Sequence, residues 1–118
     1  MKDYKFRIWD KEDKHMDYMG IVSLIFGKEG NLLENQDIMQ YTGLKDKNGV
    51  EIYEGDIIKA LNRNYDCEDD RKKYFQTFKV TYLNGCYMFS NWNAQEFYNK
   101  FMFKEVIGNI YENQDLIK

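Results

Sequence analysis

A chain of 118 residues is long enough for one compact domain, or for a small barrel that carries an extra sheet. Aromatic residues make up 17% of it, which excludes a disordered protein, and because proline is absent the turns must be set by Gly, Asn and Asp. The net charge of −3 argues against a surface that is basic all over for nucleic acid, and it is too small for a mimic of the DNA backbone.

The first predicted strand covers residues 4–9, where apolar side chains at even positions alternate with Lys5, Arg7 and Trp9. Alternation with period two is typical of a half-buried strand, so these three side chains should share the face opposite the apolar one. The charged residues 10–14 then predict a turn.

The N-terminal segment lacks a signal-peptide pattern, and no stretch of the sequence reaches the ~18 apolar residues of a membrane span. We therefore expect a cytoplasmic protein with no membrane partner. In that compartment Cys67 and Cys86 should both be reduced.

The remaining strand predictions come from short runs rich in β-branched and aromatic residues, bounded by Gly, Asn and Asp. They lie at residues 16–19, 21–26, 38–42, 50–53, 57–61, 74–83, 86–89 and 103–111. The run 57–61 holds two adjacent isoleucines that point to opposite faces, so this strand should be central or covered on both sides. Within 74–83, Phe78, Val80 and Tyr82 should share one face.

Glycine and asparagine mark the points where consecutive strands should turn. Asn48-Gly49 and Asn84-Gly85 predict hairpins, because both residue types tolerate positive φ. Gly43 and Gly55-Asp56 are interpreted as further turns. Gly108, inside a predicted strand, indicates a bulge or a close approach to another backbone.

Two segments are less regular than the strands. Residues 62–73 are the most polar stretch of the chain and predict a long exposed loop. Asn93 could cap a short helix with Glu96 three residues later, although the aromatic residues that follow could equally begin a strand. We expect a helical turn or a loop here, and then a strand.

These elements predict a mainly β fold with little helix. The order of the later strands suits a small SH3-like barrel over residues 41–118, with an N-terminal β segment, residues 1–40, packed on it. Alternatively, the two parts form one compact unit.

Few residues in the sequence have the partners that chemistry would require. His15 is the only histidine and has no second metal ligand near it, so we interpret it as a surface residue. Cys86 is interpreted as a small strand residue, and the carboxylates around Cys67 disfavour a thiolate. The sequence therefore predicts no catalytic residue, no metal site and no cofactor, and we expect a protein that is not an enzyme.

Aromatic and basic side chains around the polar stretch offer an alternative, a nucleic-acid-binding barrel. The surface it would use consists of Trp92, Tyr65, Tyr74, Arg63, Arg71, Lys72 and Lys73. Such platforms hold the bases of single strands by stacking. The interpretation that we favour is that the aromatic residues fill a small core and an oligomer interface.

Four stretches of the sequence resemble the YopX-like family of phage and prophage proteins. They are KFRIWD at residues 5–10, MQYTGLKDKNGVEIYEGDII at 39–58, the hairpin after the polar stretch, and EVIGNIYENQDL at 105–116. The matching positions are Trp9, Asp10, Tyr41, Thr42, Gly43, Leu44, Asp46, Gly49, Tyr53, Gly55, Asp56, Gly108 and Asn109. We interpret them as residues that maintain the fold, although Tyr41, Asp46, Tyr53 and Glu54 could also line a shared surface.

The resemblance implies a mostly β protein of phage or prophage origin in the bacterial host cytoplasm. It also implies an SH3-type barrel in the second half and self-association into a homo-oligomer, and it brings no activity and no catalytic residues. We therefore expect a non-enzymatic accessory protein that acts as a protein-interaction or self-assembling β module through its loops and strand edges. The nucleic-acid-binding barrel is the alternative.

Overall fold

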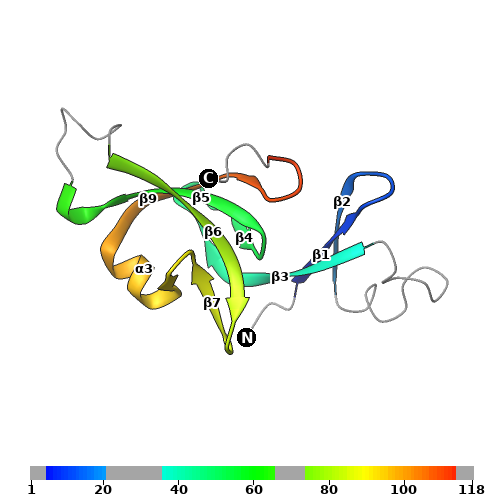
Figure 1. The fold of residues 1–118 in the computed structure, drawn as a ribbon, viewed down its shortest axis with the longest axis horizontal. Coiled ribbons are helices and arrows are strands. Elements are labelled where there is room, and N and C mark those ends of the chain that lie inside the picture. Colours follow the sequence, from blue (N-terminus) through cyan, green and yellow to red (C-terminus); the bar gives the residue numbers. More distant parts are fainter. Residues whose placement is uncertain (1–4, 21–35, 66–73, 114–118) are drawn as a thin grey trace.

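The fold is that of a computed structural model, which describes residues 5–20, 36–65 and 74–113 (Figure 1). Antiparallel strands dominate this part of the chain, so the predicted mainly β fold class is confirmed. The strands form two sheets that lie toward opposite ends of the molecule (Figure 1).

The first sheet has the strand order β2-β1-β3-β4. Its strands are β1 (Lys5–Asp10), β2 (His15–Gly20), β3 (Gln36–Lys45) and β4 (Glu51–Tyr53). The predicted charged turn joins β1 to β2, and the Asp10 side chain accepts hydrogen bonds there from the backbone N–H groups of Glu12 and Asp13. Asp favours turns because its side chain can bind its own backbone in this way.

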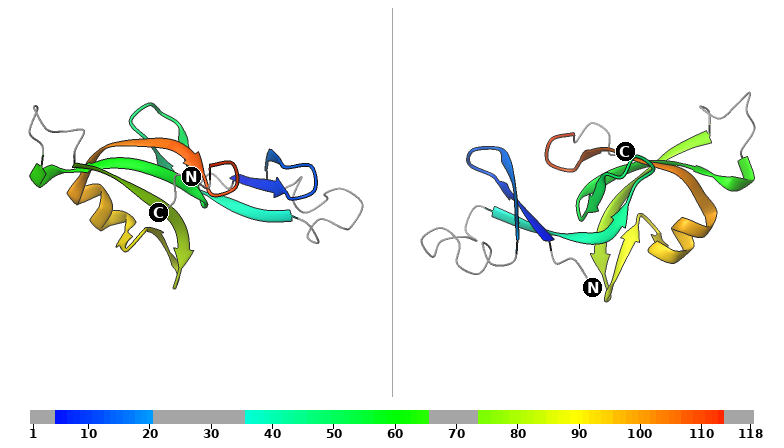
Figure 2. Two further views of the ribbon diagram at one scale, coloured as in Figure 1. Left: turned by 45° about the horizontal axis from the view of Figure 1, so that its top comes forward. Right: turned by 180° about the vertical axis from the view of Figure 1, so that it is seen from behind.

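Strand β3 belongs to two pairings in succession. Its residues 36–40 pair with β1, whereas Tyr41 and Lys45 pair with β4. The register shifts between those two residues, where Gly43 has a φ of +87°. Gly43 is thus a bulge residue inside a strand and not a turn residue. The predicted boundary between the N-terminal β segment and the barrel, at 40/41, falls inside this continuous strand (Figure 2). It coincides with the point where the pairing of β3 changes from β1 to β4.

The second sheet has the strand order β8-β7-β6-β5-β9. Its strands are β5 (Asp56–Asn62), β6 (Phe75–Leu83), β7 (Cys86–Phe89), β8 (Trp92–Asn93) and β9 (Phe101–Asn109). A 3-10 turn, η2 (Arg63–Tyr65), follows β5, and helix α3 (Ala94–Lys100) leads into β9. β5 lies between β6 and β9, and Ile57 and Ile58 are both buried, so the predicted central strand is confirmed.

The two predicted Asn-Gly turns differ in geometry. Asn84 and Gly85 both have positive φ, at 51° and 84°, and they join β6 to β7 as the expected two-residue turn. In the connection from β3 to β4, Gly49 has a φ of +81° but Asn48 does not share the positive φ. That connection is longer than two residues, so one glycine is enough to close it.

An aromatic cluster fills the space between the second sheet and α3. The buried residues of this core are Ile52, Ile58, Ala60, Phe78, Val80, Phe89, Phe97 and Phe101. The ring of Phe97 on α3 stacks on Phe89 with centroids 4.3 Å apart, and Phe78 meets it edge-on at 4.8 Å. The sheet curls around α3 (Figures 1 and 2), because these rings pack against its concave face.

Asn93 caps helix α3 as the sequence predicts. Its side chain accepts a hydrogen bond of 2.8 Å from the Glu96 N–H, and the Glu96 side chain accepts one of 3.2 Å from the Asn93 N–H. This capping box stabilises a helix of 7 residues that would be marginal alone. The chain then passes directly into β9 at Phe101, so a helix and a strand both follow Asn93.

The fold thus contains a half-barrel, and the more specific SH3-like shape stays a prediction. The predicted strand at 21–26 and most of the predicted loop at 62–73 lie outside the described residues. Within the described residues, no helix combines the length and the apolar character that crossing a membrane would demand.

Candidate functional site

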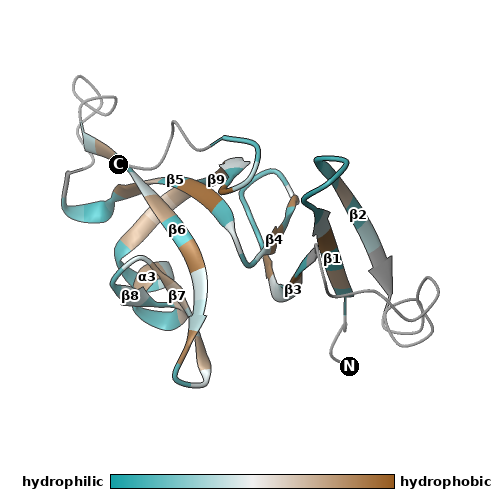
Figure 3. Cartoon of the chain, turned by 45° about the vertical axis from the view of Figure 1, so that its right-hand side comes forward, coloured by the Kyte–Doolittle hydropathy of each residue, from teal (hydrophilic) through white to brown (hydrophobic). Residues whose placement is uncertain are grey.

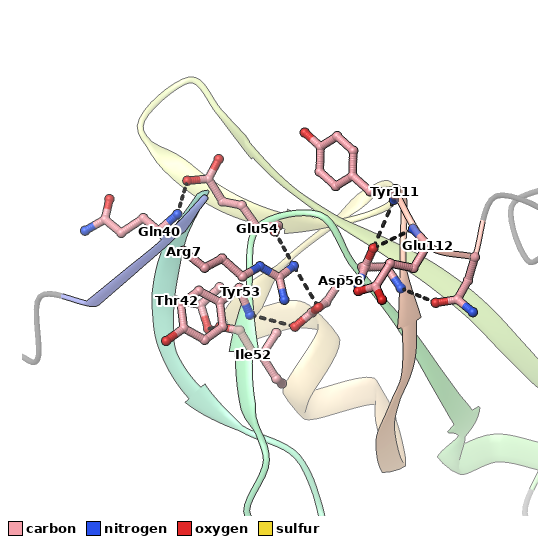
Figure 4. Close-up of polar contacts among 11 residues, drawn as sticks. Arg7, Gln40, Thr42, Ile52, Tyr53, Glu54, Asp56, Tyr111 and Glu112 are labelled. Carbon is pink, nitrogen blue, oxygen red and sulfur yellow. Dashed lines mark hydrogen bonds and ion pairs between the residues drawn. The ribbon is translucent and has the colours of Figure 1, made fainter. Parts of the chain in front are cut away.

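The two sheets meet at a buried ion pair between Arg7 on β1 and Asp56 at the start of β5 (Figure 4). Both residues are 2% exposed, and Arg7 Nη2 lies 2.9 Å from Asp56 Oδ1. The same nitrogen donates a hydrogen bond of 2.9 Å to the Glu54 carbonyl oxygen. The guanidinium also lies over the ring of Tyr53, 4.9 Å from its centroid. We call Arg7, Tyr53, Glu54 and Asp56 the junction.

The Asp56 carboxylate is bonded on both oxygens, because its Oδ2 accepts a hydrogen bond of 2.8 Å from the Tyr53 N–H. Burial raises the pKa of Asp56 above its ordinary value, and the charge of Arg7 and the Tyr53 N–H offset part of that rise. Arg7 Nε is buried without a hydrogen-bond partner in the described part of the chain, so the pair is incompletely compensated. The interpretation of Asp56 as a turn residue is wrong, since it belongs to β5 and its side chain bonds inside the protein.

Arg7 is the residue that sequence reasoning missed. It stands in an alternating strand beside Lys5 and Trp9, which indicates a half-buried strand rather than one covered on both faces. In the structure Arg7, Ile8 and Trp9 are all buried. The turn after β4 contacts Arg7 although Glu54 lies 47 positions away in the sequence, so no local signal could have revealed the contact.

Gly55 lies at the centre of the junction. Its φ is +85°, which confirms the expected turn conformation. Its N–H donates to the Val80 carbonyl and its own carbonyl accepts from the Ile110 N–H, both at 2.8 Å. A Cβ atom at this position would lie 3.0 Å from Met39 Sδ. Glycine is therefore favoured here by the backbone conformation, and a larger residue would also press against the Met39 side chain.

The end of β9 is closed by a turn that Asn109 organises. Its Oδ1 accepts hydrogen bonds from the N–H groups of Tyr111 and Glu112, at 3.0 and 2.9 Å. A Cβ on Gly108 would lie 2.4 Å from Asn113 Oδ1, so the close approach predicted at this glycine comes from a side chain and not from a backbone. The β5–β9 register also shifts beside Gly108, as expected of a bulge. Tyr111, predicted in the strand, belongs to this turn.

Tyr111 links this turn back to the first sheet. Its ring stacks on Trp9 with centroids 5.3 Å apart, and its hydroxyl donates a hydrogen bond of 2.9 Å to Asp37 Oδ2. Burial and the bond to Asp37 raise the pKa of Tyr111 to about 12. The first sheet is therefore attached to the second through Trp9 as well as through Arg7.

Asp46 holds the β3–β4 connection against β9. Its Oδ1 accepts hydrogen bonds from the N–H groups of Asn48 and Val50, and its Oδ2 accepts one from Val106, at 2.8 to 2.9 Å. Burial alone would raise the pKa of Asp46, but these backbone donors outweigh it and hold the pKa below its ordinary value. Asp46 is buried, as are Tyr41 and Tyr53, so these three do not line an exposed surface.

Other positions in the YopX-like stretches also serve the backbone. Thr42 Oγ1 donates a hydrogen bond of 2.7 Å to the Ile52 carbonyl, and Figure 4 labels both residues. The same oxygen accepts a hydrogen bond of 3.1 Å from the Leu44 N–H. Leu44 packs against the aromatic core. These contacts are what residues that maintain a fold would make.

Only part of the predicted binding surface lies among the described residues. Trp92 lies in the short strand β8 rather than in a loop, half-buried, with its ring edge-on to Phe101 at 5.6 Å. The side chain of Tyr65 and the residues Arg71, Lys72 and Lys73 lie outside what the structure describes. Arg63 is exposed and contacts Met102, with Nη1 3.9 Å from Sδ.

Residues that could carry chemistry stay apart from one another. His15 begins β2, is exposed, and has Nε2 2.8 Å from Asp17 Oδ1. Cys86 is an exposed free thiol on β7, and Cys67 lies outside the described residues. Over residues 5–20, 36–65 and 74–113, no three His, Cys, Asp or Glu side chains converge as metal ligands would.

Two adjacent exposed apolar side chains lie at the end of the β6–β7 hairpin. Tyr82 and Leu83 are 53% and 57% exposed, and Tyr82 meets Tyr87 edge-on at 5.0 Å. Figure 3 shows hydrophobic residues beside the hydrophilic turn of this hairpin, which projects from the body of the molecule. Tyr82 shares the strand with the buried Phe78 and Val80, but it lies beyond the end of the core.

Comparisons with known proteins agree with the fold and leave the function open. A family model described as YopX protein matches residues 23–118. None of the curated proteins matches the chain. Among solved structures, the crystal structure of protein EF1440 from Enterococcus faecalis is similar over 100% of both chains, with a TM-score of 0.63 and 24% sequence identity. At that identity the likeness supports the fold alone.

Proposed function

This chain belongs to the YopX family, and we propose that it is a non-enzymatic accessory protein that self-associates through its β6–β7 hairpin. Its partner surface is a second copy of the same hairpin. The bacterial host cytoplasm and a phage or prophage origin are part of this proposal, and they are supported by the resemblance of the sequence.

The single observation that carries the proposal is the exposure of Tyr82 and Leu83 at 53% and 57%. Tyrosine contributes a large contact area and is enriched at the centres of protein interfaces. The two-residue turn at Asn84-Gly85 fixes the direction of the hairpin, so little conformational entropy would be lost on association.

The use of polar groups inside the protein supports a non-enzymatic role. Asp46 accepts three backbone hydrogen bonds, and Asp56 is bonded to Arg7 and to a backbone N–H. The bonds of both carboxylates go to groups inside the protein, so their role is to hold the backbone and the two sheets in place.

The mass of the native particle in solution tests the proposal, measured by light scattering after size-exclusion chromatography. We expect a discrete multimer for the native protein and a monomer for Leu83→Asp, because a carboxylate at the hairpin end would be buried without a partner. Val50→Asp is the matched control, since Val50 is 47% exposed in another turn, and it should keep the native mass. A native monomer, or a Leu83→Asp variant with the native mass, would contradict the proposal.

A further inference from the structure

Strand β3 joins two parts of the molecule that have separate pairings. Its residues 36–40 pair with β1, and β1 pairs with β2, so these three segments form one hydrogen-bonded unit. From Tyr41 onward β3 pairs with β4 instead. This second half of β3 and β4 pack with the half-barrel, since Ile52 belongs to the aromatic core and Asp46 bonds to the Val106 N–H on β9. We call β1, β2 and residues 36–40 the N-terminal arm.

The N-terminal arm lies outside the aromatic core. Within the described residues, the buried members of that core and the partly buried residues packed against them all lie at Leu44 or later in the sequence. In the same ranges, β1 and β2 pair only within the first sheet and run alongside no strand of the second. Figure 1 shows the arm at one end of the molecule, away from α3. Parts of a chain that are joined through a small interface are expected to move relative to one another.

The contacts that hold the arm closed include a charge pair that is costly to bury. Arg7 on the arm is paired with Asp56 on β5, and Trp9 on the arm is stacked on Tyr111. Arg7 Nε is buried without a hydrogen-bond partner in the described part of the chain, and burial raises the pKa of Asp56 in spite of the pair. A buried ion pair often stabilises a protein less than well-packed apolar residues of the same volume. The arm is therefore attached less firmly than the half-barrel is held together.

The change of partner in β3 provides a pivot for the arm. Gly43 follows it directly, with a φ of +87° and nothing within 4 Å of a Cβ built there, so the backbone has room to change direction. Hinges are a few residues at the ends of elements that absorb a change in φ and ψ. Gln40 exchanges two hydrogen bonds of 3.0 Å with Glu54, and because these lie at the pivot they need not break when the arm moves.

We propose that the N-terminal arm is a hinged element that swings away from the half-barrel about residues 40–43 when the Arg7–Asp56 pair and the Trp9–Tyr111 stack separate. Opening brings Arg7 and Trp9, which are 2% and 9% exposed in the closed form, into contact with water. Hydration of the two separated charges offsets part of the lost attraction. The pairing of β1 with β2 and with residues 36–40 lies wholly within the arm and is kept. The β6–β7 hairpin is no part of the arm, so the motion is independent of the proposed self-association.

The two tryptophans of the chain test the proposal, because Trp9 lies in the arm and Trp92 lies in the half-barrel. Labelling with 5-fluorotryptophan gives each of them its own fluorine NMR resonance, and the Trp92→Phe variant assigns the two. In a urea series we expect the Trp9 resonance to leave its native position first, while the Trp92 resonance and the far-ultraviolet circular dichroism stay native. A shared urea midpoint for both resonances would overturn the proposal. Loss of the strand signal together with the Trp9 resonance would also overturn it, since the arm would then unfold instead of swinging.

A variant at the junction and a variant in the core separate the two parts. Arg7→Met leaves Asp56 buried without its counter-charge in the closed form, so the ratio of open to closed arm should rise at least about a hundredfold. The urea midpoint of the Trp9 resonance should fall much further than that of Trp92. Phe97→Ala is the matched control, which should lower the Trp92 midpoint and leave the ratio of open to closed arm unchanged below it. Equal shifts of both midpoints in Arg7→Met, or an arm opened by Phe97→Ala, would contradict the hinge.

Discussion

The aromatic core of the second sheet and the junction between the sheets are both buried, but they are built in opposite ways. The core has Phe78, Phe89, Phe97 and Phe101 in contact, with no charged group among its buried members. The junction buries Arg7 and Asp56 instead. Apolar rings tolerate many arrangements, whereas hydrogen bonds are directional. The core therefore stabilises the half-barrel, and the junction sets where the first sheet attaches to it.

The comparison also explains where the YopX-like positions lie. Trp9, Tyr53, Gly55 and Asp56 contribute to the contacts between the sheets, and none of them belongs to the aromatic cluster. A core position accepts other residues of similar volume at modest cost. A buried charge accepts no substitute while its partner stays, so the residue type is fixed at such a position.

The largest effect should come from breaking the ion pair. Arg7→Met leaves the Asp56 carboxylate buried without its counter-charge and should lower the free energy of unfolding by about 3–5 kcal/mol, measured by urea denaturation. The double variant Arg7→Met with Asp56→Asn should recover a large part of that loss, because no charge is then buried alone. Phe97→Ala in the core should cost about 3–5 kcal/mol and should not be rescued by Asp56→Asn. A double variant no more stable than Arg7→Met would refute the charge argument.

The glycine of the junction should be less replaceable than the glycine of the β3 bulge. Gly55 and Gly43 have φ of +85° and +87°, but a Cβ on Gly55 would meet Met39 Sδ at 3.0 Å while one on Gly43 would meet nothing within 4 Å. Gly43→Val should cost about 2 kcal/mol through backbone strain, and Gly55→Val at least ~1 kcal/mol more. Thermal unfolding of the two variants provides the measurement. Equal melting temperatures would show that crowding at the junction is unimportant.

Asp46 should make part of the stability depend on pH. Its pKa in the folded protein is below the ordinary value of 3.8, so its contribution is present above that value and is lost as the pH falls through the folded pKa. Asp46→Asn places an amide among three N–H donors and should cost about 1–3 kcal/mol at neutral pH. The difference between the two proteins should shrink below pH 4, in urea titrations at each pH. A constant difference across this range would contradict the role of the ionised carboxylate.

The smallest effect should come from the second attachment of the first sheet. Tyr111→Phe keeps the stack on Trp9 and removes the hydrogen bond to Asp37, which should cost about 1 kcal/mol. The pKa of Tyr111 is raised from 10.0 to about 12, so its contribution is present below pH 10 and is lost as the pH rises toward 12. The native protein should therefore lose stability in this range faster than Tyr111→Phe, measured by circular dichroism during denaturation. A parallel loss in both proteins would exclude Tyr111 as the cause.

Local features could be predicted because neighbouring residues decide them. Asn84-Gly85 closes its hairpin, Asn93 and Glu96 form the capping box, and Gly55 has positive φ. The patterns of apolar side chains also indicated most of the strands, and the adjacent Ile57 and Ile58 indicated that β5 is covered on both sides. Each of these features depends on contacts within a few positions along the chain.

Other features were not predictable from local patterns. Tyr82 follows the same alternating pattern as Phe78 and Val80, but it is exposed because β6 extends beyond the aromatic core. Trp92, expected in a loop, is half-buried in β8. The contact of Arg63 with Met102 also joins residues 39 positions apart, since Arg63 follows β5 and Met102 lies in β9.

The sequence by itself determined most of the strands, the Asn84-Gly85 turn and the helix cap, because backbone preferences and side-chain periodicity act over short distances. Only the tertiary structure decided that Arg7 is buried against Asp56, 49 residues away in the sequence. Whether a charged side chain is exposed or paired depends on which distant strand covers it. That choice is made when the two sheets pack together.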